Sequence, residues 1–337
     1  MRKLQISVMT IGQFAVSLLF LFLLLLFSLF GTGALWFQFS SAVGWLFLAL
    51  FWSICLFILH CHFKNKRPLA WFLLLAVFTV FISWWQNIKP SNDRNWAADV
   101  ARGVTMEQNG NDIIVHSVRH FDWRSKEDYI PKWETRHYNL NDLTSVDLFS
   151  SVWDFPAIAH TMISFGFKNG DHLVFSAEIR RENDEEFSTL GGFFRKFELI
   201  LIAADERDII RLRTNIRKED VSLYPLKMTP EAMRALFTTY LQLGNYLAAH
   251  PKFYQTVTAN CTTVIYHLAK LIDPEIPADW RILVSGYLID YLYEQHAVAA
   301  DIPLDRLKTE AKISTLGRQA GNSDDFSQII RTYDRKK

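Results

Sequence analysis

The sequence predicts a bundle of three N-terminal transmembrane helices followed by an α+β domain on the extracytoplasmic side of the membrane. Three observations lead to this fold class. No Asp, Glu, Lys or Arg occurs between Leu4 and Phe63, so charge is segregated along the chain. Three apolar runs near the N-terminus are each long enough to cross the ~30 Å hydrocarbon core of a bilayer. The rest of the chain mixes strand-like and helix-like segments with frequent charged residues.

The three expected spans cover residues 10–30, 42–61 and 69–86. Gly31-Thr32-Gly33 predicts a turn after the first span, and a basic loop separates the second and third. A cleaved signal peptide is the alternative for the first run, but its apolar stretch is longer than the usual signal-peptide core. The predicted domains are a membrane anchor over residues 1–90, an outer domain over 91–310 and a polar tail over 311–337.

Basic residues beside the spans predict the orientation. Arg2 and Lys3 precede the first span, and Lys64, Lys66 and Arg67 lie in the loop before the third. Basic residues beside a span favour the cytoplasmic side of the membrane. Two crossings lie between the two groups, so both groups can lie on that side. The prediction is a multi-pass protein of the bacterial inner membrane with a cytoplasmic N-terminus and a periplasmic C-terminal domain.

The charge of the outer region excludes several kinds of partner. Residues 91–337 carry 30 basic against 35 acidic residues and contain no basic run, which argues against nucleic acid. No glycine-rich phosphate loop is present, so no nucleotide is expected. The histidines and cysteines show no metal-ligand spacing, and we expect neither a metal nor another cofactor.

Cys261 is the only cysteine of the outer region, since Cys55 and Cys61 belong to the second span. It follows Asn260, a favoured helix N-cap, and precedes an apolar run, so we expect it in the first turn of a helix. There the positive helix end lowers the pKa of a thiol, and free backbone N–H groups can hold an oxyanion. A small buried cysteine without chemistry is the alternative interpretation.

His160 is the best candidate for the base that a cysteine nucleophile needs. It opens a predicted strand that an Asn169-Gly170 turn joins to a second strand ending near Glu178. A two-residue turn would put His160 and Glu178 on opposite faces and a three-residue turn on one face, and the sequence leaves both open. His172, expected to face solvent at the turn, is the reserve candidate. His267 is excluded because it lies too far along the helix of Cys261, and His250 is expected at the surface.

Two arginine-containing segments allow two interpretations each. The alternating charges from Glu206 to Arg213 fit a solvated helix face with local ion pairs, or arginines that bind a phosphate headgroup or brace Glu178. Arg180-Arg181 share both interpretations. The Arg119–Arg124 segment is interpreted as mainly structural.

These residues resemble the Lnb N-terminal periplasmic domain family over about residues 95–295. The resemblance lies in a series of motifs along the chain, which includes Ala159-His160-Thr161, Ser176-Ala177-Glu178-Ile179-Arg180, Asp205-Glu206-Arg207-Asp208, Pro251-Lys252-Phe253-Tyr254 and Asn260-Cys261-Thr262-Thr263. It implies a papain-like, circularly permuted NlpC-type fold, in a group that includes the lecithin:retinol acyltransferases. It further implies Cys261 as nucleophile and His160 as base, with Ser176, Glu178, Arg180, Asn260 and Thr262 supporting or lining the site.

Three functional hypotheses follow. The name-giving proteins of the family are lipoprotein N-acyltransferases, so the resemblance implies a membrane-anchored acyltransferase or lipase that uses a phospholipid acyl donor and possibly a lipoprotein acceptor. A cysteine amidase or peptidase acting on peptidoglycan or peptides is the second hypothesis. A non-catalytic membrane scaffold is the third. An anchor of three N-terminal spans departs from the architecture of the name-giving enzymes. This chain can therefore share their catalytic chemistry and still use a different acyl acceptor.

Overall fold

The computed structural model describes residues 11–39 and 42–332. Arg2, Lys3, Thr10 and the last five residues of the expected tail lie outside these ranges. The chain divides into two compact units, and each is described by itself. The helix unit comprises Met1–Pro90 together with Phe193–Lys196, and the sheet unit comprises Ser91–Gly192 and Phe197–Lys337.

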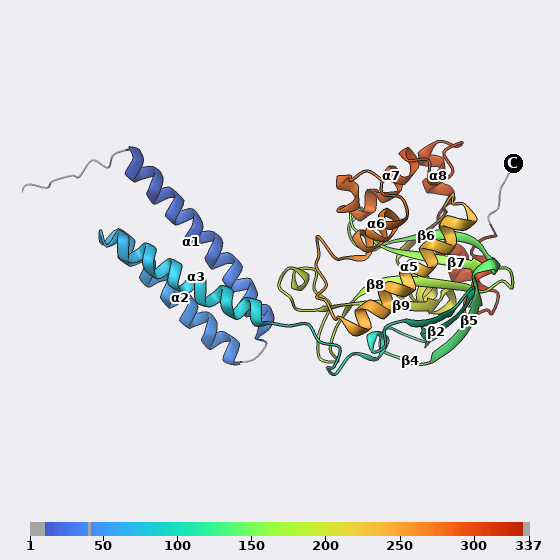
Figure 1. Ribbon diagram of the computed structural model, residues 1–337, viewed down its shortest axis with the longest axis horizontal. Coiled ribbons are helices and arrows are strands. Elements are labelled where there is room, and N and C mark those ends of the chain that lie inside the picture. Colours follow the sequence, from blue (N-terminus) through green and yellow to red (C-terminus); the bar gives the residue numbers. More distant parts are fainter. Residues whose placement is uncertain (1–10, 40–41, 333–337) are drawn as a thin grey trace, which may run out of the picture. The chain divides into compact units, whose positions relative to one another are not determined.

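The helix unit contains three helices that are long and apolar enough to span a membrane, and the described residues hold no others. They are α1 (Ile11–Gln38), α2 (Ala42–Phe63) and α3 (Arg67–Asn87) (Figure 1). Most of their large apolar side chains point away from the bundle, as expected for helices in lipid. Three apolar N-terminal helices are therefore confirmed.

The expected break at Gly31-Thr32-Gly33 is wrong, because α1 continues through it to Gln38. A β-carbon at Gly31 would collide with the ring of Phe51 on α2, and one at Gly33 would collide with the ring of Phe194. The glycines therefore allow aromatic rings to pack closely against an unbroken helix. In hydrocarbon a helix keeps its hydrogen bonds because no water can replace them, so glycine is a weak helix breaker there.

The sheet unit is built on a mixed eight-stranded sheet in the order β1-β2-β9-β8-β7-β6-β10, with β5 also paired to β2. Only the β2–β9 pair is parallel among the described strands. The strands are β1 (Thr105–Asn109), β2 (Asp112–Arg119), β5 (Trp133–Asn139), β6 (Leu143–Val152), β7 (Ala159–Phe167), β8 (His172–Arg180), β9 (Glu198–Asp205) and β10 (Asp220–Pro225). A short hairpin pairs β3 (Asp122–Trp123) with β4 (Tyr129–Ile130).

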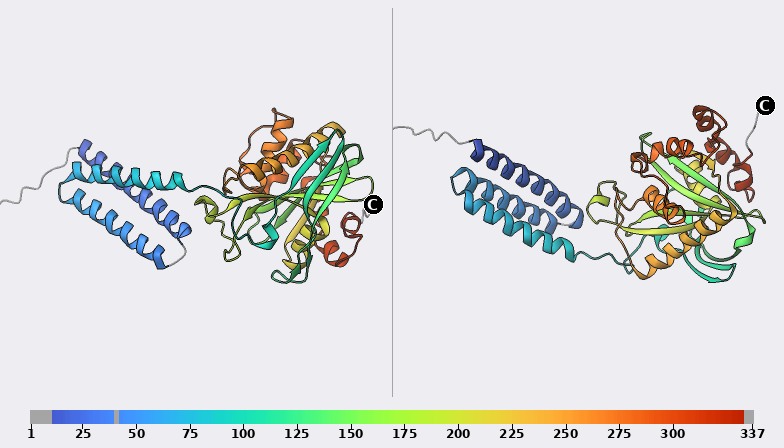
Figure 2. Two further views of the ribbon diagram at one scale, coloured as in Figure 1. Left: turned by 60° about the horizontal axis from the view of Figure 1, so that its bottom comes forward. Right: turned by 45° about the horizontal axis from the view of Figure 1, so that its top comes forward.

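Helices cover both faces of this sheet (Figures 1 and 2). On one face pack α5 (Pro230–Ala249), α6 (Cys261–Ile272), α7 (Leu288–Glu294) and α8 (Leu304–Glu310). On the other pack α4 (Glu206–Arg211), α9 (Ser314–Ala320) and α10 (Phe326–Ile329). Alternate residues of each strand feed the two cores, with Phe175 in one and Val174 in the other. The α+β class is therefore confirmed.

Shorter helical turns connect these elements. They are Ala98–Val100, Leu140–Asp142, Gly191–Phe193, Trp280–Ile282 and Ser285–Tyr287, together with a π-helical turn, Leu212–Ile216, directly after α4. The 3₁₀ turn Ser285–Tyr287 leads directly into α7. Thr229 is the N-cap of α5, because its hydroxyl accepts from the Ala232 N–H.

The expected polar tail from Ala311 is wrong for residues 311–332. Phe326 and Ile330 are 0% and 1% exposed in the second core, and Arg331 bonds both Glu206 and Asp147. The helices of this segment are only four and seven residues long, and their apolar residues are too few to show a helical period. The segment nevertheless closes one face of the sheet.

Candidate functional site

Cys261 is the first residue of α6, as the sequence predicts. The Asn260 Oδ1 accepts from the N–H groups of Thr262 (3.0 Å) and Thr263 (2.9 Å), and the Asn260 N–H donates to the Thr263 hydroxyl (2.8 Å). This reciprocal capping box fixes the start of the helix. The thiol is consequently held in the first turn, where the helix dipole favours its anionic form.

The cap also decides which backbone donors remain for an oxyanion. Since Asn260 occupies the N–H groups of Thr262 and Thr263, these two cannot serve. Among the described residues, the Cys261 N–H has no hydrogen-bond acceptor. The expectation of several free helix N–H groups is therefore reduced to one, on the nucleophile itself.

The sheet opens where α6 begins. The pairing between β7 and β8 ends at Ile163 and Phe175. Beyond this pair β7 stays with β6 as far as Ala159, and β8 stays with β9 as far as Arg180. The start of α6 lies against the free end of β7, since the Thr262 and Thr161 hydroxyls are 3.0 Å apart and the Cys261 Sγ lies 3.9 Å from the Ala159 carbonyl oxygen.

The turn of this hairpin settles the question of faces. The Phe167 N–H donates to the Asp171 carbonyl, and Lys168-Asn169-Gly170 form a three-residue loop with Gly170 at φ +89°. The positive φ favours glycine at this position. The same register, continued past the last pair, would set His160 opposite Glu178, and the 3.2 Å contact between the His160 Nε2 and the Glu178 Oε1 shows that both side chains lie on one face of the sheet.

His160 and Glu178 are joined directly and through Ser176. The His160 Nε2 lies 2.7 Å from the Ser176 Oγ and 3.2 Å from the Glu178 Oε1. The Ser176 hydroxyl donates to the same Glu178 oxygen at 2.7 Å. With Nε2 engaged in this way, Nδ1 is the ring nitrogen left to exchange a proton with the Cys261 thiol, whose pKa the charge of His160 lowers.

Arg213 braces Glu178 from the other side. Its guanidinium donates to the Glu178 Oε1 at 3.0 Å and to the Glu219 Oε2 at 3.4 Å. The Ser151 hydroxyl donates to the same Glu219 oxygen. Arg213 is 4% exposed and is presented by the π-helical turn after α4. Of the two interpretations of the charged segment, bracing of Glu178 is therefore the one that the geometry supports.

The electrostatics of the cluster favour an ion pair between Cys261 and His160. Burial alone would raise the pKa of the thiol, but the neighbouring imidazolium outweighs it and lowers the Cys261 pKa to about 6. Burial likewise lowers the His160 pKa, yet the Glu178 carboxylate raises it to about 9. The Glu178 pKa is held well below its usual range, because His160 and Arg213 outweigh the effect of burial. Thiolate and imidazolium therefore coexist at neutral pH.

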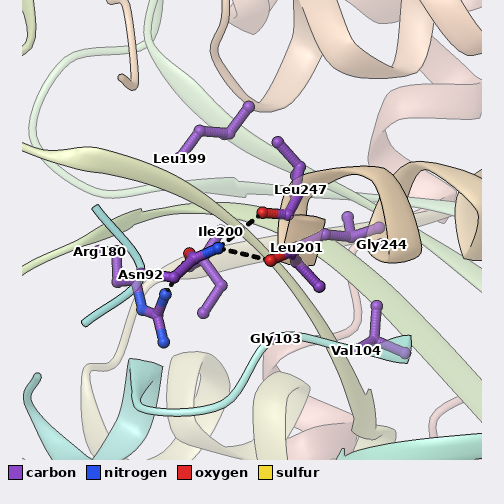
Figure 3. Close-up of a pocket in the computed structure, with 10 residues that line it drawn as sticks. Asn92, Gly103, Val104, Arg180, Leu199, Ile200, Leu201, Gly244 and Leu247 are labelled. Atoms are coloured by element: carbon purple, nitrogen blue, oxygen red, sulfur yellow. Dashed lines mark hydrogen bonds between the residues drawn. The ribbon is translucent and has the colours of Figure 1, made fainter. Parts of the chain in front are cut away.

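Arg180 does not join this cluster, although the resemblance implies it at the site. It borders a cavity of about 190 Å³ between β9 and α5, where Figure 3 shows it beside Asn92. Its guanidinium donates to the Asn92 Oδ1 (2.8 Å), the Val100 carbonyl (3.1 Å) and the Ala101 carbonyl (2.7 Å). The Asn92 amide in turn donates to the last carbonyls of α5. Arg180 therefore fixes the segment that enters the sheet unit.

The other candidate histidines lie away from the thiol. His172 is at the turn end of the hairpin, half-buried at 3.5 Å from the fully buried Glu206, and the expectation that it faces solvent is wrong. His267 and His250 are exposed. Within the described residues, no group of three or more potential metal ligands occurs.

The charged segment of α4 is buried rather than solvated. Glu206 and Asp208 are both 0% exposed. Asp208 forms a two-point ion pair with Arg119 at 2.9 Å, so the structural interpretation of Arg119 is confirmed. Glu206 accepts from the Ser164 hydroxyl and from Arg331. These carboxylates hold the helices of the second core to the sheet.

Sequence reasoning missed Thr161, Ser151 and Glu219. Thr161 lies beside Cys261, with its hydroxyl 3.0 Å from that of Thr262, and lowers the pKa of the thiol further. Its position directly after His160 is the signal that could have identified it. Glu219 and Ser151 act only through Arg213 and lie in segments with no marked pattern, so no local signal pointed to them.

One comparison with known proteins gives a match. Residues 129–286 match the family model of the Lnb N-terminal periplasmic domain, a range that includes His160, Glu178, Arg213 and Cys261. No curated protein and no solved structure matches the chain. The family predicted from the motifs is thereby confirmed. Residues 129–286 therefore carry an Lnb N-terminal periplasmic domain, in a membrane protein in which this periplasmic domain accompanies three apolar helices.

Proposed function

We propose that this protein is a membrane-anchored, thiol-dependent acyltransferase or lipase that takes an acyl chain from a phospholipid. The proposal depends mainly on the pair formed by Cys261 and His160. Cys261 lies at the capped start of a helix and its pKa is lowered, while Glu178 raises the pKa of His160 and so keeps the imidazole protonated. A cysteine kept only for packing would have no reason to be ionised at neutral pH, because burial by itself disfavours the thiolate.

The proposed reaction has two halves. The Cys261 thiolate attacks the ester carbonyl carbon of the phospholipid, and the Cys261 N–H donates to the oxygen that becomes negative. The carbon–oxygen bond to glycerol then breaks, the His160 imidazolium gives its proton to the departing alkoxide, and a thioester remains on Cys261. An amine or water next attacks the thioester, His160 removes its proton, and the thiolate leaves.

Glu178 and its neighbours are positioning residues in this scheme. Glu178 stabilises the imidazolium and, with Ser176, fixes the ring through Nε2. Arg213 and Glu219 keep the Glu178 carboxylate ionised and in place. The ring can therefore exchange its proton at Nδ1 without turning.

The membrane anchor supports a lipid as the acyl donor. A domain tethered to the bilayer meets phospholipid esters at a high effective concentration. We further propose that the helices cross the bacterial inner membrane with the N-terminus in the cytoplasm, as the basic residues of the loop before α3 favour. A lipoprotein amine is the acceptor that the match to the Lnb N-terminal periplasmic domain favours.

We also propose that the sheet unit is a circularly permuted, papain-like fold of the NlpC type. The support is the order of the parts, since the strand that bears His160 precedes the helix that begins with Cys261. The packing of that helix start against the opened end of the sheet fits the same assignment.

The test is incubation of the full chain in nanodiscs with a phospholipid labelled in one acyl chain, scored for lysophospholipid. Wild-type protein should release it, and Cys261→Ala should not. Release by both proteins, or by neither under conditions in which the wild type is folded, would overturn the proposal. A muropeptide digest run in parallel covers the alternative amidase, whose signature would be cleavage that depends on Cys261 without lysophospholipid.

A further inference from the structure

The exposed apolar side chains of the sheet unit gather in loops near Cys261. Among its described residues, twelve large apolar side chains are exposed, and nine of them belong to four loops: Trp153, Phe155, Ile158, Phe187, Leu190, Val257, Trp280, Leu283 and Tyr287. We call these nine side chains the apolar rim. The other three are Ile130, Tyr246 and Leu271. Phe155, Leu190 and Trp280 are each more than 60% exposed.

Hydrogen bonds connect two of the loops to the strand of His160. The Ala159 N–H donates to the Ser285 hydroxyl at 2.8 Å, and the Gly286 N–H donates to the Ala157 carbonyl at 3.0 Å. The loop with Trp153 and Phe155 therefore lies against the loop with Trp280 and Tyr287, directly beside the start of β7.

The remaining two loops flank Cys261 through its cap. The Asn260 amide donates to the Thr256 carbonyl at 2.7 Å, and the Thr256 hydroxyl donates to the Thr189 carbonyl at 3.0 Å. Leu190 and Val257 thus belong to segments that are linked to the residue preceding the thiol. Both pairs of loops are consequently connected to the immediate neighbours of the candidate catalytic groups.

The composition of these loops favours an apolar partner. Residues 187–193 and 254–258 contain no charged residue. Arg281, between Trp280 and Leu283, has its charge compensated by Asp279 (2.8 Å) and Glu294 (2.6 Å). Clusters of exposed Trp, Phe and Leu of this kind mark an interaction surface, and Trp is favoured at the boundary between lipid and water.

One of the loops continues into the helix unit. Phe193–Lys196 form one compact unit with the membrane helices, and the Phe194 ring lies 5.4 Å from Phe37 and 5.6 Å from Phe30. The Gln38 amide donates to the Phe194 carbonyl at 2.8 Å. Leu190 of the apolar rim precedes Phe193 by only three residues, so the rim is joined through a short stretch of chain to a segment that packs on the membrane helices.

We propose that the apolar rim is a membrane-docking surface whose occupant is the lipid bilayer that the same chain spans. Docking would bring the start of α6 with Cys261 to the level of the phospholipid esters, and a lipid would not have to leave the bilayer to reach the thiol. The inference does not require catalysis, because it concerns only where the loops lie.

The test uses wild-type full chain in nanodiscs made with an ether-linked phospholipid that carries a diazirine in its acyl chain. An ether lipid has no ester carbonyl for a thiolate, so the result is independent of the proposed reaction. After illumination, mass spectrometry locates the lipid adducts. The peptides with Phe155, Leu190 and Trp280 should carry adducts, and so should the membrane helices. The peptide with Leu271, which is 72% exposed at the far end of α6, should carry several-fold fewer.

A variant series sharpens the result. Phe155→Ser with Trp280→Ser should reduce the adducts on these two loops several-fold, whereas Leu271→Ser should leave them unchanged. Adducts confined to the membrane helices would overturn the proposal. The proposal would also be overturned if a soluble protein bound to the chain had to be removed before the rim peptides became labelled. A dimer in the native mass spectrum whose second copy covers the rim would overturn it as well.

Discussion

Replacing His160 by Asn tests the ion pair between the two candidate catalytic groups. In the wild type the Cys261 pKa is lowered to about 6 from the usual 9.0, and the imidazolium is the main cause that lowers it. Without His160, the effect of burial is no longer opposed by a cation, and the thiol pKa should return to 9.0 or higher. A change of three pKa units corresponds to ~4 kcal/mol between the two protonation states.

The size of the effect follows from these values. At pH 7 about 90% of the wild-type thiol is ionised, against about 1% in His160→Asn. Only the thiolate is alkylated, so the variant should react more slowly. Its rate falls by less than the ionised fraction, because a more basic thiolate is also a stronger nucleophile. The midpoint of the pH profile is therefore the quantity to measure.

The assay is alkylation of Cys261 by iodoacetamide in the full chain between about pH 5 and pH 10, followed by mass spectrometry of its peptide. The wild-type midpoint should lie near 6, and that of His160→Asn should lie at or above 9. His267→Asn is the matched control, because His267 is exposed on the same helix and should leave the profile unchanged. A wild-type midpoint near 9, or equal midpoints in wild type and His160→Asn, would refute the ion pair.

Three further predictions concern the groups around this pair. Glu178→Gln should lower the pKa of His160 and so shift the alkylation midpoint of Cys261 upward, since Glu178 is the main cause that raises the His160 pKa; an unchanged midpoint would contradict its bracing role. Asn260→Ala should lower the free energy of unfolding, measured by urea denaturation, by ~1 kcal/mol because α6 loses its cap. Asn260→Ser should retain most of the wild-type stability, since serine can also cap a helix. Equal urea midpoints for the wild type and both variants would contradict the capping role of Asn260. Arg331→Ala should lower the free energy of unfolding by ~3–5 kcal/mol in the same assay, because it removes the cation that pairs with the buried carboxylates of Asp147 and Glu206. The exposed Arg318→Ala is the control and should change it by less than about 0.5 kcal/mol. A loss for Arg331→Ala no larger than that for Arg318→Ala would contradict a stabilising role of the two buried ion pairs.

The local parts of the fold were predictable because local physics determines them. The membrane helices follow from apolar length, and the start of α6 follows from the preference of Asn for the N-cap. The prediction of a helix break at Gly31 was wrong because it did not take account of the surroundings of the helix. In hydrocarbon the helix retains its hydrogen bonds, and close packing against Phe51 makes glycine favourable there.

The distant contacts were not predictable from patterns. Cys261 and His160 are 101 positions apart. Elimination among the histidines and the family resemblance both pointed to this pair, but no local pattern could show their contact, and the hairpin register was open between two turn lengths. The bracing by Arg213 depends on a π-helical turn that no propensity indicates. The burial of Phe326 and Ile330 likewise depends on neighbours far along the chain, because helices this short carry no periodic signal.

The most direct measurement of the central claim is the mass of the Cys261 peptide after the full chain is exposed to a phospholipid with an isotopically labelled acyl chain. The account predicts a labelled thioester on Cys261 that hydroxylamine removes and that is absent from Cys261→Ser. A folded wild-type protein whose Cys261 remains an unmodified thiol while its lipid stays intact would contradict the account.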